Sequence, residues 1–197
     1  MVVLAIIVVL SGVVLSSQST FNKTLVLANT AYDIALTMRS AQTYGLGSRA
    51  SGVVANAGYG LHFDKNITNS FKLFADTGGG ASCVGMTPDC KPGNNIYGAG
   101  DELKQTYELN NGLFIGDFCA QSSGSWSCAV SEEGGLTSLD VVFARPNPDA
   151  FMSKDGSYSP LFPVTAACIT ISSPQGGSRF VSVGAAGQII ANATSCP

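Results

Sequence analysis

The sequence has little charge, a single histidine and few of the residue groups on which enzymes usually depend. Only 12% of its 197 residues are charged, and the net charge is −3. A chain that binds the phosphate backbone carries a basic surplus, so we expect no nucleic-acid partner. Nucleophile elbows, phosphate-binding loops and paired catalytic carboxylates are missing as well. We therefore expect no enzyme, no resident cofactor and no small-molecule substrate.

The cysteines favour disulfides over a metal site. The six cysteines fall as neighbouring pairs along the chain, and with His62 as the only histidine a zinc site is disfavoured. Other pairings are possible in principle, but turn-rich sequences between neighbours favour the sequential one. The expected disulfides are Cys83–Cys90, Cys119–Cys128 and Cys168–Cys196. Disulfides indicate an oxidising compartment outside the cytosol.

Charge is also missing from the N-terminal segment. No charged residue precedes Lys23, and neither Pro nor Gly occurs from Ser16 to Tyr44. Residues 1–15 span roughly 22 Å as a helix, and the uncharged residues 16–20 extend it to about 30 Å, the thickness of a hydrocarbon core. We expect a retained membrane or filament-core helix. Its assembly residues are Val2, Val3, Leu4, Ile6, Ile7, Val8, Val9, Leu10, Val13, Val14 and Leu15.

A cleaved secretory signal is the alternative interpretation of this segment. A signal peptide begins with basic residues and ends in small residues at its cleavage site. Here no basic residue occurs, and Ser16-Ser17 is a weak match to a cleavage site. Under this alternative the protein is a secreted, disulfide-bonded binding module or adhesin.

The apolar run continues into a pattern typical of an amphipathic helix. Small residues in the pattern would let the helix approach a sheet closely, and we expect Gly45 and Gly47 to end it in left-handed backbone geometry. The apolar stripe predicted from steps of three and four comprises Leu25, Ala28, Tyr32, Ala35, Met38 and Gln42, widened by Ala31 and Ile34. We divide the chain into an N-terminal helical region 1–52, with filament segment 1–15 and amphipathic part 16–52, and a β-rich head 53–197.

Beyond the helix the apolar period changes to two, which indicates β-strands. The expected hairpins join 59–63 with 70–74, 103–109 with 112–118 through Asn110-Asn111-Gly112, and 167–172 with 179–183; further strands are 136–144 and 187–191. Segments 77–100 and 145–163 are predicted to be loops. Alternation places His62 on the face opposite Leu61 and Phe63, where we expect it to face solvent.

These elements predict an α+β fold, in which a long N-terminal α-helix, first apolar and then amphipathic, packs on an antiparallel β-sheet head with disulfide-stapled loops. Oxygen-bearing side chains cluster beside the first stapled loop and could bind Ca²⁺, although their spacing is not that of an EF-hand. A polar surface loop is the simpler interpretation. The calcium candidates are Asp76, Asn94, Asp101 and Glu102, with Asn95 beside them.

Several segments, taken in order, resemble the type IV pilin and type II secretion pseudopilin family, and most closely its GspH/FimT-like branch. Residues 4–10 are similar to its apolar segment, and residues 27–42 to its amphipathic continuation. The remaining similar segments are 59–64 and 74–76, which resemble its first hairpin, and 142–146 and 187–190, which resemble later strands.

This resemblance implies a pilin-like fold and a structural role in a bacterial filament. Subunits of the family self-associate into a helical filament, after residing in the inner membrane as single-pass proteins, and then form an extracellular surface filament. Family precursors carry a basic leader, a glycine at the peptidase cut, an aromatic first residue and a nearby glutamate, and this sequence has none of these around Met1. Prepilin peptidase cleavage and N-methylation are implied for the precursor, and the role of the glutamate is assigned to no residue here.

Overall fold

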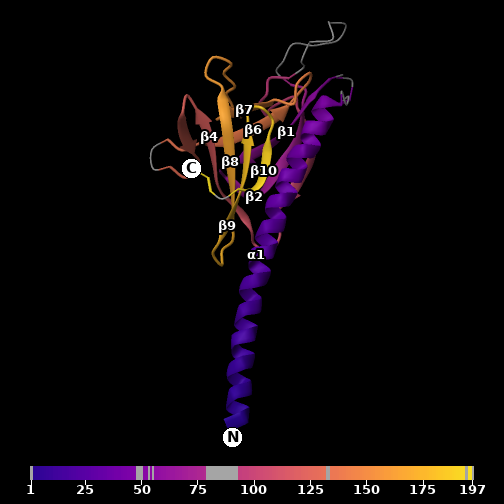
Figure 1. Cartoon of the computed structure of the whole chain (residues 1–197). Helices are drawn as coiled ribbons and strands as arrows, with labels where there is room; N and C mark the ends of the chain where they lie inside the picture. Colours follow the sequence, from indigo (N-terminus) through magenta and orange to yellow (C-terminus); the bar gives the residue numbers. More distant parts are fainter. Residues whose placement is uncertain are drawn as a thin grey trace.

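The computed structural model describes residues 2–47, 51–52, 54, 56–78, 93–131, 134–193 and 195–196. Within them lie one long helix, α1 (Val2–Leu46), and two five-stranded antiparallel sheets (Figure 1). The first sheet has the order β3 (Glu102–Glu108), β2 (Ile67–Asp76), β1 (Gly58–Asp64), β6 (Ser138–Phe143), β7 (Ala150–Lys154). The second has the order β10 (Ile189–Ala193), β9 (Ser178–Gly184), β8 (Val164–Ser172), β4 (Phe114–Ser122), β5 (Ser125–Cys128).

The two sheets correct the expected fold class. We expected a long helix packed on one antiparallel sheet, and this is wrong: the body is mostly β-sheet, and only the helical segment 24–46 lies against it. That segment contacts β1 and β6 of the first sheet and β8, β9 and β10 of the second. Figure 1 shows the rest of α1 extending away from both sheets. Most of the buried apolar residues lie on the strands, and the helical segment adds a smaller set to the same core.

The buried stripe of α1 is rotated from the predicted one. Its buried members are Leu27, Ala31, Ile34, Ala35, Met38 and Ala41. Tyr32 and Leu25, both in the predicted stripe, are 56% and 44% exposed. The predicted members Ala31, Ile34, Ala35 and Met38 are confirmed as buried. Apolar residues occur on more than one face of this helix, so periodicity placed only part of the face that meets the sheets.

The end of the helix differs in mechanism from the prediction. Helix α1 ends at Leu46, where the Gly47 N–H donates to the Thr43 carbonyl at 2.9 Å. Gly45 and Gly47 are not among the glycines with positive φ, so neither supplies left-handed geometry. Gly45 is needed for a different reason, since a Cβ there would collide with the main-chain carbonyl of Phe143 in β6. The helix and β6 therefore approach each other through a glycine.

Two predicted hairpins are confirmed and one is wrong. Strands β1 and β2 pair, as do β8 and β9. Strands β3 and β4 do not pair, because β3 joins β2 and β4 joins β8 and β5. Asn111 and Gly112 do form a turn with positive φ, but the buried side chains of Leu113 and Ile115 carry the chain into the second sheet. Strand β7 lies in a segment that was predicted to be a loop.

The few side chains that α1 buries against the two sheets should therefore hold this helix on the body. Ile34 is fully buried in α1, and Leu36, two residues later, is 63% exposed. We expect Ile34→Ala to lower the free energy of unfolding by about 2–5 kcal/mol, because it removes apolar contacts and leaves a cavity. Leu36→Ala should change it by no more than about 0.5 kcal/mol. Urea unfolding of the two variants checks this, and equal losses would contradict the observed orientation of α1.

Candidate functional site

The first candidate site is the projecting part of α1. Its apolar side chains Val2, Val3, Leu4, Ile6, Ile7, Val8, Val9 and Leu10 are between 53% and 74% exposed. The side chains of Val13, Val14 and Leu15, also predicted assembly residues, lie outside the described part of the structure. Exposed apolar area is unfavourable in water by about 25 cal/mol per Å². In the part of the chain that the structure describes, no helix is both long and apolar enough to cross a membrane.

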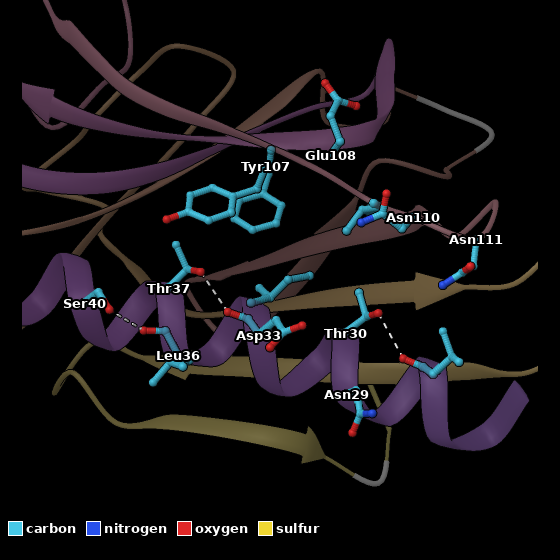
Figure 2. A pocket seen from close by; sticks show the side chains of 14 residues that line it. Asn29, Thr30, Asp33, Leu36, Thr37, Ser40, Tyr107, Glu108, Asn110 and Asn111 are labelled. Carbon is cyan, nitrogen blue, oxygen red and sulfur yellow. Dashed lines mark hydrogen bonds between the residues drawn. The ribbon is translucent and has the colours of Figure 1, made fainter. Parts of the chain in front are cut away.

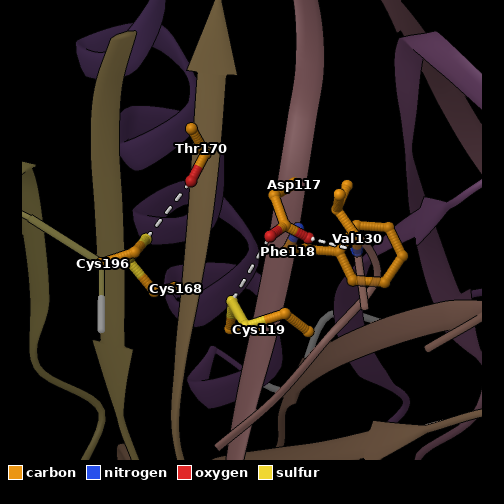
Figure 3. Close-up of a disulfide and its surroundings, with 8 residues drawn as sticks. Asp117, Phe118, Cys119, Val130, Cys168, Thr170 and Cys196 are labelled. Atoms are coloured by element: carbon orange, nitrogen blue, oxygen red, sulfur yellow. Dashed lines mark hydrogen bonds between the residues drawn. A yellow bond between two sulfur atoms is a disulfide. The ribbon is translucent and has the colours of Figure 1, made fainter. Parts of the chain in front are cut away.

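Two disulfides fasten the second sheet (Figure 3). Cys119 of β4 bonds to Cys128 of β5, and Cys168 of β8 bonds to Cys196. Both match the pairing predicted from sequence, and the predicted Cys83–Cys90 pair lies outside the described residues. Cys119 and Cys168 are direct partners in the β4–β8 ladder, so the two bonds lie on adjacent strands.

The carboxylate of Asp117 lies beside the first of these disulfides. Asp117, Cys119 and Cys128 bring their ligand atoms within 4.8 Å of one another, the spacing of a metal site. The two sulfurs are bonded to each other, however, and a metal needs them as thiolates. Asp117 instead accepts the N–H of Phe118 at 2.8 Å and of Val130 at 3.0 Å (Figure 3). The group therefore holds the chain after β5 in place.

A row of polar side chains crosses the outer face of the first sheet. The register aligns Lys72, His62, Asp140 and Ser153 on β2, β1, β6 and β7. His62 Nδ1 lies 2.6 Å from Asp140 Oδ1, and Ser153 Oγ lies 3.1 Å from Asp140 Oδ2. The prediction that His62 faces solvent is wrong, because it is buried. Alternation did place it on the correct face of the strand.

The cover over this row is the loop at residues 93–101. Tyr97 of this loop packs on His62 with ring centroids 4.6 Å apart and the planes tilted by 38°, and it packs edge-on against Phe74 at 5.1 Å. The Lys72 ammonium lies 4.8 Å from the centroid of the same ring. The periodicity of the strands holds no information about a loop from elsewhere in the chain, which explains why the burial of His62 was missed.

A buried carboxylate anchors the loop. Asp76, only 2% exposed, accepts the N–H groups of Asn94 at 3.0 Å and Asn95 at 2.8 Å. The Ser153 hydroxyl lies 2.9 Å from the Asn95 carbonyl, so the loop is also held from β7. Burial raises the pKa of Asp76 to about 7, the two N–H groups oppose that rise, and the charges of Asp101 and Asp140 add to it.

The other calcium candidates are likewise engaged with the protein. The Asp101 carboxylate accepts backbone N–H groups from Thr77, Gly78 and Gly98 at 2.8–2.9 Å. Glu102 contacts Lys104 and Ser51, and chiefly the Lys104 ammonium holds the pKa of its carboxyl below the usual range. The Asn94 side chain accepts the N–H of Ile96. These hydrogen bonds tie the carboxylate and amide oxygens to the chain. The residues therefore shape the loop in this structure, and calcium binding stays a prediction.

A cavity of about 650 Å³ lies between α1 and the β2–β3 edge of the first sheet (Figure 2). Helical residues from Val26 to Ser40 form one wall. Phe71, Tyr107 and residues 108–111 form the other. Sequence reasoning missed this cavity because it depends on where α1 crosses the sheet. Comparison with protein-family models, curated proteins and solved structures gives no match to this chain.

The Asp76 anchor should make stability depend on pH. Its pKa rises from 3.8 to about 7 on folding, so its contribution is fully present below about pH 4 and is lost as the pH rises through about 7. The loss is at most about 4 kcal/mol, at 1.36 kcal/mol per pKa unit. Asp76→Asn is neutral at every pH. We expect the wild type to lose unfolding free energy relative to the variant as the pH rises from 4 to 8, and denaturant unfolding at each pH measures this. If the unfolding free energies of the two proteins change in parallel with pH, the raised pKa of Asp76 is contradicted.

Proposed function

We propose that this protein is a structural subunit of a filament of the type IV pilus or type II secretion class. The observation that carries the proposal is the projecting part of α1, whose described apolar residues from Val2 to Leu10 are at least 53% exposed. The same segment has no charged residue, since Lys23 is the first in the chain. The order of sequence segments that resemble pilins supports the same class of protein.

Self-association gives these residues a partner that the single chain does not provide. Burying a Val, Leu or Ile side chain fully contributes about 1.5–3 kcal/mol, and several lie along this helix. Because the apolar residues surround the helix, copies can pack against it from more than one direction, as a filament requires. The partners in the proposal are other copies or related subunits. The proposed location is the bacterial inner membrane before assembly and the cell surface afterwards.

The β-sheet body suits exposure outside the cell. Two disulfides hold the second sheet, as expected in an oxidising compartment. The body is joined to the projecting helix without a break, because α1 is continuous from Val2 to Leu46. Each subunit in the proposed filament then has the projecting part of α1 before residue 24, called the apolar rod, inside and a folded β-sheet body outside.

A charge on the rod should prevent assembly without unfolding the body. Ile7→Lys places an ammonium on the projecting helix, where packing of copies would have to desolvate it. We expect filaments to be lost in electron micrographs of expressing cells, with the thermal unfolding midpoint of the purified chain unchanged. Leu161→Lys is the matched control, because Leu161 is 83% exposed but lies on a body loop.

Normal filament yield from Ile7→Lys would overturn the proposal. So would N-terminal sequencing that shows the mature protein to lack the rod, since the secreted binding module or adhesin would then be the better interpretation.

A further inference from the structure

We propose that the cavity between α1 and strand β3 is a binding groove for a neutral oligosaccharide. This proposal does not depend on filament assembly, since every residue of the groove belongs to the body or to the helical segment packed on it. It adds a ligand that the sequence did not suggest.

One wall of the groove is the end of an aromatic ladder. Phe63, Phe71 and Tyr107 stand on neighbouring strands β1, β2 and β3, with ring centroids 5.7 Å and 5.1 Å apart. The Phe71 and Tyr107 planes differ by only 6°. Strand β3 is the edge of its sheet, so no neighbouring strand of this sheet covers the outer face of Tyr107. An aromatic face carries partial negative charge and suits the C–H face of a pyranose ring.

The opposite wall presents amide and carboxylate groups. Asn29 and Asp33 lie one helical turn apart on α1, and both are among the residues that line the groove. Asn110 and Asn111 lie at its end. None of these four side chains has a hydrogen-bond partner among the described residues. An amide both donates and accepts, and a carboxylate accepts, which matches the hydroxyl groups of a sugar.

The hydroxyls of the helical wall are partly engaged. Thr30, Thr37 and Ser40 donate to the carbonyls of Val26, Asp33 and Leu36 at 2.8–3.0 Å (Figure 2). Their oxygens still accept from a ligand. The wall therefore has acceptors along its length, with Asn29 next to Thr30 and Asp33 between Thr30 and Thr37 in the helix.

The charges of the groove select against anionic ligands. The described residues that line it include Asp33 and Glu108 but neither Lys nor Arg. Glu108 is bonded by the Asn69 amide at 3.4 Å, so Asp33 is the unpaired acidic group. The cavity, at about 650 Å³, is within the usual range for small-ligand sites. An uncharged chain of a few sugar rings fits this shape, aromatic face and charge.

The test is calorimetric titration of the full chain, dispersed in a zwitterionic detergent that has no sugar headgroup. The neutral probes are cellotetraose, maltotetraose, chitotetraose and mannotetraose. We expect at least one to bind with a dissociation constant of about 1 mM or tighter. Tetragalacturonic acid, the anionic comparison, should not bind.

Variants locate the binding. Tyr107→Ala should weaken it about tenfold or more, because the stacking face is lost. Asp33→Ala, at an exposed helical position that should not affect folding, should weaken it about fivefold. The matched control is Tyr32→Ala, because Tyr32 is next to Asp33 and 56% exposed but does not line the groove. Equal weakening by the control would overturn the assignment.

Two other results would also overturn it. One is failure of all four neutral sugars to bind. The other is binding of tetralysine in their place, abolished by Asp33→Ala, which would make the groove a site for basic peptides.

Discussion

The burial of one side of a short helical segment against two sheets at once is the constraint on which the rest of the molecule depends. Ile34 and Met38 are fully buried, and α1 contacts strands of both sheets. Because the two sheets share this helix, its position sets the direction in which the projecting part leaves the body. It also sets the width of the cavity beside β3. The proposed assembly and binding functions are thus consequences of a single packing arrangement.

The outer face of the first sheet shows how the same body handles buried polar groups. Asp140 bonds to both His62 and Ser153 under Tyr97, and Asp76 accepts backbone donors of the covering loop. Polar groups removed from water require partners, and here the partners come from a loop that crosses the sheet. The strand sequences alone leave these groups unexplained.

Local patterns predicted the parts of the fold that depend on neighbouring residues. The alternation of Leu61, His62 and Phe63 gave the correct faces of β1, and cysteine spacing gave two disulfides that the structure contains. Tertiary packing decided the rest. The turn at Asn111-Gly112 forms as its residues favour, yet it connects two sheets, because Leu113 and Ile115 are buried beyond it. Tyr32 looked like a packing residue, but the helix meets the sheets through other positions.

For the candidate site, sequence identified the apolar rod but neither the groove nor the polar row. Both require residues that are distant in the chain, such as Asp33 with Tyr107 or His62 with Tyr97. The bond between Cys168 and Cys196 has a mechanical consequence of the same long-range kind. Strand β10 is the outermost strand of its sheet and lies against α1, and the segment just after it is tied covalently to β8, beyond β9. A pull on the helix therefore cannot peel β10 away strand by strand, and the load passes into the middle of the sheet.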